Sequence, residues 1–160
     1  MVTQGTTANG DFGQLVEPAL LALADQDVLV VGALGGRDPS ALGITPPDNA
    51  RVAAYPWFDE LLPRADLLVT NGGAGGTQRA LASGIPVVMC GTTEEKPMNA
   101  ARVAYHRVGI NLATATPTCE QLRDAVTTIL GDPTYREAAG RLKNAYAAHD
   151  PIAVIEGLLL

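Results

Sequence analysis

Basic residues are scarce in this 160-residue chain, and no long hydrophobic run occurs in it. Eleven Lys and Arg stand against seventeen Asp and Glu, which gives a formal net charge of −6. We expect neither a nucleic acid nor an anionic membrane as a partner, because no basic face is available to neutralise phosphates. No segment approaches the roughly 18 consecutive apolar residues of a membrane span, and the first four residues are unlike a signal peptide. We therefore expect a soluble chain without a membrane span.

Cysteine is also rare. Cys90 closes an apolar run of strand type and Cys119 opens a helix-like stretch, so these isolated residues do not indicate a disulfide framework. This usage favours a reducing, cytoplasmic setting.

No cluster of carboxylates resembles a metal site, and we expect neither a metal nor another cofactor. The composition, 47% hydrophobic and 18% charged, is that of a globular protein.

Six short apolar runs alternate with stretches in which apolar residues recur at helical spacing. The length suits one domain, and no repeat or linker divides it. Apolar strands separated by helices predict an α/β fold, a doubly wound, Rossmann-like parallel sheet with helices on both faces. The strands are expected at residues 2–4, 28–31, 51–54, 67–70, 86–89 and 110–112. The helices are expected at residues 15–23, 78–83 and 97–107 and after the capping residues Thr118 and Asp132.

A glycine-rich stretch, residues 72–76, joins the fourth predicted strand to a segment of helical composition. Glycine permits backbone conformations and close approaches that a Cβ would block. Backbone amides at a helix N-terminus can then face an anion closely, which suits a phosphate group. A tight strand-to-helix turn without a ligand is the alternative interpretation.

Five loops follow the carboxyl ends of the predicted strands. Ligands of doubly wound sheets bind beyond these ends, so we expect the loops to line one crevice. On the first loop, the hydroxyl groups of Thr6 and Thr7 suit phosphate oxygens, and a polar turn is the alternative. The loops cover residues 6–7, 34–37, 55–58, 71–77 and 91–96.

Two of these loops carry side chains that suit the other parts of a nucleotide ligand. Tyr55, Trp57 and Phe58 place three aromatic rings within four positions. A nucleobase stacks on an aromatic face, while core packing of one or two of the rings is the alternative. Glu95 and Lys96 offer an acceptor and a donor for adjacent hydroxyl groups of a sugar, unless they only begin a solvated helix.

Together these stretches resemble the donor-binding half of bacterial nucleotide-sugar glycosyltransferases. These are macrolide and UDP-glucosyltransferase-like enzymes of the GT-B fold, related to plant and animal UDP-sugar transferases. The resemblance covers nearly the whole chain, and the order and spacing of several motifs agree with the family pattern. The motifs lie at residues 61–66, 71–77, 80–81, 84–88 and 95–100.

The resemblance implies roles in holding the base and the phosphates. Thr6 falls near the phosphates, Tyr55 where an aromatic ring stacks on the base, and Phe58 where backbone atoms touch the base edge. Trp57 stands in the place of a proline, so the resemblance leaves open which ring stacks. The implied pyrophosphate loop contains Gly73, Ala74, Gly75, Gly76 and Thr77.

Other positions depart from the family pattern. Asn71 replaces a histidine and can still donate a hydrogen bond, although it carries no charge. Arg79 stands where many relatives hold the ribose with a glutamate. Glu95 and Lys96 replace an Asp-Gln pair that grips the sugar, which leaves the identity of the sugar open.

The catalytic half of such enzymes is not expected in this chain. Family members have two domains and about twice this length, and their N-terminal domain holds the acceptor and the catalytic histidine. His106 and His149 are not expected at the rim, where a base must reach the attacking hydroxyl. Residues 1–160 are therefore expected to form a single donor-binding domain, without the N-terminal acceptor domain and without catalytic residues. Met1 directly before the first strand fits a fragment or a naturally separate subunit.

The resemblance implies transfer of a hexose from a UDP- or dTDP-sugar to a hydroxyl group of a small, natural-product-like acceptor. We expect this chain to bind the donor and to transfer little alone. One alternative is the donor subunit of a two-chain N-acetylglucosaminyltransferase, and another is a non-catalytic nucleotide-binding module. An NAD-binding domain is disfavoured because the glycine-rich loop follows the fourth strand and does not match Gly-x-Gly-x-x-Gly.

Overall fold

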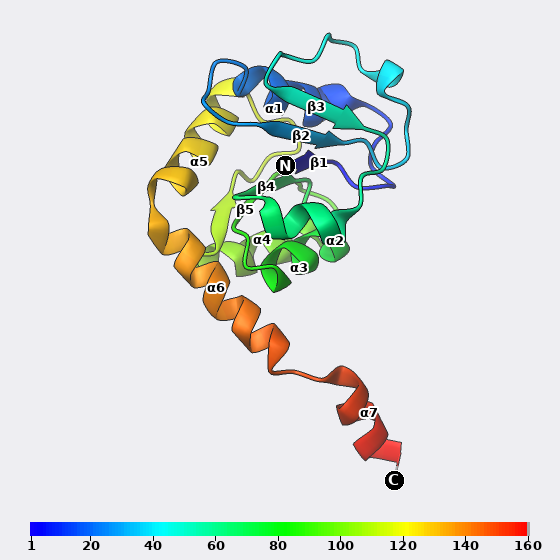
Figure 1. Ribbon diagram of the computed structural model, residues 1–160, viewed down its shortest axis with the longest axis vertical. Helices are drawn as coiled ribbons and strands as arrows, with labels where there is room; N and C mark the ends of the chain where they lie inside the picture. Colours follow the sequence, from blue (N-terminus) through cyan, green and yellow to red (C-terminus); the bar gives the residue numbers. More distant parts are fainter. Residues whose placement is uncertain (160) are drawn as a thin grey trace.

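One parallel sheet forms the centre of the chain (Figure 1). The computed structural model describes residues 1–159. Within them, six strands are ordered β3-β2-β1-β4-β5-β6, and every neighbouring pair is parallel. This confirms the doubly wound sheet that the sequence predicts. The strands are β1 (Val2–Thr3), β2 (Val30–Ala33), β3 (Ala50–Ala53), β4 (Leu68–Thr70), β5 (Val87–Met89) and β6 (Gly109–Asn111).

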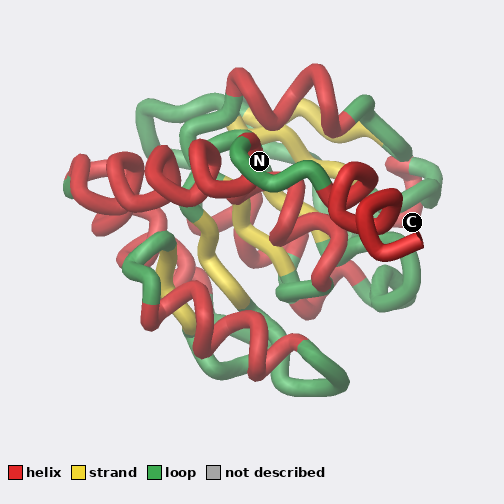
Figure 2. The backbone as a smooth tube through the Cα atoms, turned by 90° about the horizontal axis from the view of Figure 1, so that it is seen from below, coloured by secondary structure: helices red, strands yellow, loops and turns green. Residues whose placement is uncertain are grey.

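Helices cover both faces of the sheet, and Figure 2 shows the strands enclosed between them. The α-helices are α1 (Val16–Ala22), α2 (Phe58–Leu61), α3 (Ala74–Ala82), α4 (Lys96–Tyr105), α5 (Cys119–Gly131), α6 (Pro133–Ala147) and α7 (Pro151–Leu159). Short 3-10 helices are η1 (Phe12–Gln14), η2 (Pro39–Ala41) and η3 (Leu62–Arg64). Helices α1 and α5 pack on one face, and α3, α4 and α6 on the other. Helix α7 lies beyond α6, away from the sheet (Figure 1).

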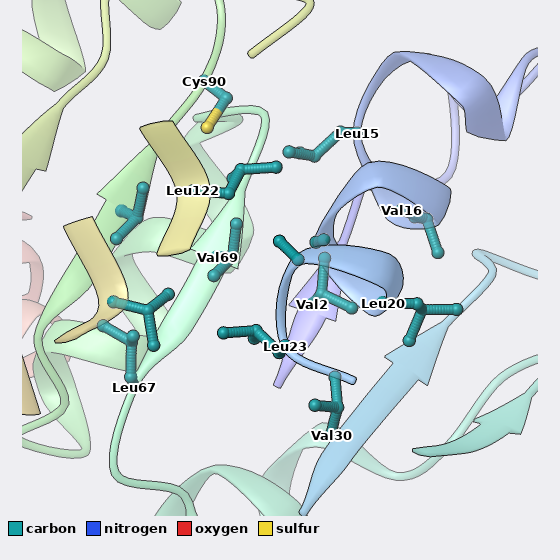
Figure 3. Close-up of a cluster of buried hydrophobic side chains, with 14 of the residues drawn as sticks. Val2, Leu15, Val16, Leu20, Leu23, Val30, Leu67, Val69, Cys90 and Leu122 are labelled. Carbon is teal, nitrogen blue, oxygen red and sulfur yellow. The ribbon is translucent and has the colours of Figure 1, made fainter. Parts of the chain in front are cut away.

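Side chains of β4 and β5 alternate between two apolar layers. Leu68 enters the layer beside α3 and α4, whereas its neighbour Val69 enters the layer beside α1 and α5. Val87 and Val88 alternate in the same way on β5. Because both faces are covered by helices, such strands are continuous apolar runs in the sequence. The layer beside α1 contains, among others, the residues labelled in Figure 3: Val2, Leu15, Val16, Leu20, Leu23, Val30, Leu67, Val69, Cys90 and Leu122.

Capping side chains fix the starts of α5 and α6 as the sequence predicts. The amide of Gln121 donates to Thr118 Oγ1 at 3.2 Å, and the amide of Thr118 donates to Gln121 Oε1 at 2.9 Å. This reciprocal pair is a capping box, which satisfies amides that the helix itself leaves without acceptors. The amide of Thr134 donates to Asp132 at 2.9 Å, and Pro133 occupies the first helical position.

Three helices differ from the sequence-based expectation. Helix α3 begins at Ala74 rather than at residue 78, so Gly75 and Gly76 lie in its first turn. Helix α2 has only four residues, which are too few for a helical pattern to show in the sequence. Helix α7 was not expected, because its mostly apolar segment lacks the periodic polar face by which a surface helix is recognised in a sequence.

Candidate functional site

A cavity of about 560 Å³ opens at the carboxyl ends of the central strands. Thr3 and Gln4 reach it from the end of β1, and Thr70 and Asn71 reach it from the end of β4. Strands β1 and β4 are neighbours although the chain forms β2 and β3 between them, so the cavity lies at the topological switch point of the sheet. Open α/β sheets bind their ligands at this position. A crevice is therefore present where the order of the loops predicts one.

Most of the residues that the sequence singles out line this cavity. Trp57 and Thr77 are not part of the lining. Trp57 is 76% exposed to solvent, and Thr77 is buried. A role of these two side chains in ligand binding stays a prediction. The predicted residues that line the cavity are Thr6, Thr7, Tyr55, Phe58, Asn71, Gly73, Ala74, Gly75, Gly76, Glu95 and Lys96.

Gln4 organises the loop that carries Thr6 and Thr7, and sequence reasoning gave it no such role. Its buried side chain donates to the carbonyls of Ala8 at 3.1 Å and Asp11 at 2.9 Å. Its Oε1 accepts the amide of Val16 at 3.0 Å. Its own carbonyl accepts a hydrogen bond from the side chain of Asn71. The loops after β1 and β4 are therefore tied together below the cavity, and the side chain of Asn71 already has this partner.

The amides at the start of α3 form a feature of the cavity that suits an anion. The amide and the hydroxyl of Thr77 both donate to the carbonyl of Gly73, at 3.2 Å and 2.9 Å. The amide of Ala74 donates to the Glu95 carboxylate at 3.3 Å. Within the described residues, the amides of Gly75 and Gly76 have no protein acceptor. These two amides are available to phosphate oxygens, which helix N-termini bind through N–H groups and the helix dipole.

Three charged residues after β5 form the opposite side of the cavity. Lys96 is buried, and its Nζ donates to the Glu94 carboxylate and, at 3.4 Å, to the hydroxyl of Thr93. Glu95 is exposed, and hydrogen bonds from its own amide and from the amide of Ala74 hold the pKa of its carboxyl below the ordinary value, with a smaller contribution from Lys96. The cavity therefore has one buried cation, and that cation is paired with Glu94.

The aromatic residues lie at the side of the cavity beyond β3. Tyr55 is exposed and lines the cavity, whereas Phe58 is half-buried and also packs against the apolar layer beside α3 and α4. Arg79 lines the same side and pairs with Asp59 at 3.4 Å. Of the two rings that line the cavity, that of Tyr55 is the more accessible, and Phe58 combines the cavity role with the core packing that was the alternative.

Gly35 shapes the cavity from the end of β2, and the sequence singled it out only as part of a rim loop. Its φ is +62°, and a Cβ there would lie 2.0 Å from the carbonyl oxygen of Gly5 and 2.7 Å from Asn9 Nδ2. The loops after β1 and β2 therefore meet at a position that only glycine fits. The signal in the sequence was a pair of glycines, Gly35 and Gly36, shortly after an apolar strand.

The histidines and cysteines lie outside this cavity. His106 and His149 line another groove between α3, α4 and α6, so the expectation that neither sits on the rim is confirmed. Cys119 is free, and so is Cys90, whose burial raises the pKa of its thiol to about 12. Among the residues that the structure describes, no group of three or more His, Cys, Asp or Glu side chains could hold a metal ion. Over the same range, no helix is long and apolar enough to cross a membrane.

The strand order and the cavity at the switch point define a Rossmann-like α/β domain of the type found in the C-terminal half of GT-B glycosyltransferases. Residues 17–159 match the family described as Erythromycin biosynthesis protein CIII-like, C-terminal domain. The match extends over most of the chain, and the chain belongs to this family.

Similar proteins support the same assignment. UDP-glucosyltransferase A1 of Starmerella bombicola is 42% identical over 98% of this chain and 34% of its own length. The 4'-demethylrebeccamycin synthase of Lentzea aerocolonigenes is 43% identical over 99% of this chain and 38% of its own length. A spinosyn rhamnosyltransferase in complex with thymidine diphosphate superposes with a TM-score of 0.88 at 27% identity, over 99% of this chain and 44% of that protein.

This chain spans about a third of the length of these sequence relatives, at 34% and 38%. These two relatives are therefore longer than the sequence analysis expects, which was about twice the length of this chain. A chain that outgrows one hydrophobic core divides into domains, so the remainder of each relative is long enough for at least one further domain.

Proposed function

We propose that this chain is the donor-binding domain of a glycosyltransferase and that it holds a UDP- or dTDP-sugar in the cavity at the switch point. The observation that carries the proposal is the pair of amides of Gly75 and Gly76, which lie at the N-terminus of α3 on the cavity wall and have no protein acceptor within residues 1–159. The thymidine diphosphate complex of the spinosyn rhamnosyltransferase supports it, because that protein shares the fold over 99% of this chain.

The walls of the cavity match the parts of such a donor. The ring of Tyr55 suits the pyrimidine base, and the amides at the start of α3 suit the diphosphate. Thr6 and Thr7 are exposed on the neighbouring loop and suit outer phosphate oxygens. Glu95 and Lys96 then lie at the end of the cavity left for the sugar hydroxyl groups.

In the longer protein, an acceptor hydroxyl attacks the anomeric carbon of the donor sugar after a base in the remaining part takes its proton. The bond from that carbon to the diphosphate oxygen breaks, and its electron pair stays on the nucleoside diphosphate. The amides of Gly75 and Gly76 stabilise the charge that develops on this leaving group. In this proposal the present chain therefore supplies binding and stabilisation of the leaving group, and the base and the acceptor site come from elsewhere.

Calorimetric titration of the chain with UDP, dTDP, UDP-glucose and NAD tests donor binding directly. We expect heat of binding with at least one pyrimidine diphosphate, because the cavity contains the amides at the start of α3. We expect no heat of binding with NAD, because the loop after β1 lacks the Gly-x-Gly-x-x-Gly pattern. Binding of NAD alone, or of none of the four compounds, would contradict the proposal.

A donor subunit that works with a separate acceptor chain is a second candidate, favoured by α7. The large apolar side chains of this helix that are described all face solvent, namely Ile152, Val154, Ile155 and Leu158. An apolar surface of this kind marks a contact with another domain or chain. This candidate would be established if mixing with a separate acceptor chain slowed amide hydrogen exchange in α7 and restored sugar transfer. Sugar transfer by one longer polypeptide that contains this chain would exclude it.

A further inference from the structure

The N-terminus of α3 already has an anion beside it. The carboxylate of Glu95, on the loop after β5, accepts the amide of Ala74 at 3.3 Å. Ala74 is the first residue of α3, and it precedes Gly75 and Gly76 in the same helical turn. A carboxylate at this place acts like a capping side chain, because it satisfies an amide that the helix leaves without an acceptor.

Glu95 makes this contact although a cation is close by. Lys96 pairs with Glu94, and no ion pair of Glu95 is formed within the described residues. Its carboxylate accepts instead the backbone amide of Ala74. Amides at a helix start are also the donors that bind phosphate groups. The carboxylate therefore uses the same kind of partner as a diphosphate, at one end of the same row of amides.

We propose that Glu95 holds the start of α3 in the donor-free domain and that the diphosphate of the donor displaces it. This inference rests on the proposed function and adds a competition within the binding site. Two anions at one helix start repel each other. Phosphate groups on the amides of Gly75 and Gly76 therefore drive Glu95 away from the neighbouring amide of Ala74, whereas the nucleoside part of a ligand does not meet it.

Displacement of Glu95 affects both the binding of the donor and the release of the product. In the donor-free domain, the Glu95 carboxylate satisfies the first amide of α3. When a nucleoside diphosphate leaves, the carboxylate returns to Ala74 and competes with rebinding. Glu95 thus lowers the affinity for the phosphate part of the ligand and favours release of the product.

The substitution Glu95→Gln tests this competition with UDP and uridine as probes, because neither contains the sugar that Glu95 is proposed to contact after displacement. We expect UDP to bind about three- to tenfold more tightly to E95Q than to the unchanged chain, since a neutral amide oxygen competes weakly for the helix start. Uridine should bind both proteins equally. The matched control is Glu60→Gln, which removes one exposed carboxylate of α2 outside the cavity lining and should leave both affinities unchanged.

The capping contact itself has a readout that needs no nucleotide. In the ligand-free protein, the NMR signal of the Ala74 amide should shift in E95Q and stay in place in E60Q. An unchanged Ala74 signal, an unchanged or weaker UDP affinity in E95Q, or an equal gain for uridine would overturn the inference. If the unchanged chain binds dTDP but no UDP, dTDP and thymidine replace UDP and uridine as the probes. If it binds neither diphosphate, the proposed function fails, and the Ala74 signal still reports whether Glu95 caps the helix.

Discussion

The substitution Gly75→Leu is expected to abolish UDP binding while the domain stays folded. Gly75 is exposed on the cavity wall, and a Cβ placed on it meets no protein atom within 4 Å. A leucine side chain therefore fits the protein but takes the space in which the proposed diphosphate lies. Loss of two amide-to-phosphate hydrogen bonds of about 1.5 kcal/mol each corresponds to a loss of affinity of at least about 100-fold. Calorimetric titration with UDP measures this loss.

Stability separates this effect from unfolding. Leucine is a far better helix former than glycine, so the melting temperature of G75L should equal or exceed that of the unchanged chain. The matched control is Gly131→Leu at the end of α5, where a Cβ also meets nothing within 4 Å. G131L should keep its affinity for UDP. If G75L bound UDP as tightly as G131L, the start of α3 would not be the diphosphate site.

Much of the fold could be predicted because it depends on local patterns. Six apolar runs separated by helical stretches allow few arrangements other than a doubly wound sheet. The start of α3 was assigned four residues too late, since glycines in a row are poor helix formers. In the structure, Gly75 and Gly76 lie in the first turn, where amides need no helical acceptor, and Thr77 closes the turn with two hydrogen bonds to Gly73.

The site was predictable at the level of loops and less so at the level of side chains. The rule that ligands bind beyond the carboxyl ends of strands led to the cavity at the switch point. The contacts of Asn71 with Gln4 and of Glu95 with Ala74 join residues 67 and 21 positions apart, so no local pattern indicates them. The orientation of Trp57 likewise depends on how α2 packs, and the spacing of the three aromatic residues does not determine it.

The loops after β4 and β5 approach each other closely at Gly91. The substitution Gly91→Ala is therefore expected to have the second large effect. Gly91 is buried, and a Cβ on it would lie 2.0 Å from the carbonyl oxygen of Asn71 and 2.8 Å from Cδ of Lys96. The Asn71 loop cannot retreat easily, because the Asn71 side chain is bonded to Gln4. We expect the free energy of unfolding to fall by about 2 to 3 kcal/mol, as for overpacking of a closed site.

The same substitution should weaken UDP binding, because the two loops carry the amides of α3 and the residues Glu95 and Lys96 on opposite sides of the cavity. Urea unfolding gives the loss of stability, and titration at a temperature where G91A is still folded gives the loss of affinity. Gly73→Ala is the matched control for the stability measurement, since its Cβ would meet only Asn71 Oδ1, at 3.8 Å, which is an ordinary contact. If G91A were as stable as G73A, the loop after β5 would move freely away from Asn71, and the width of the cavity would not be set by this contact.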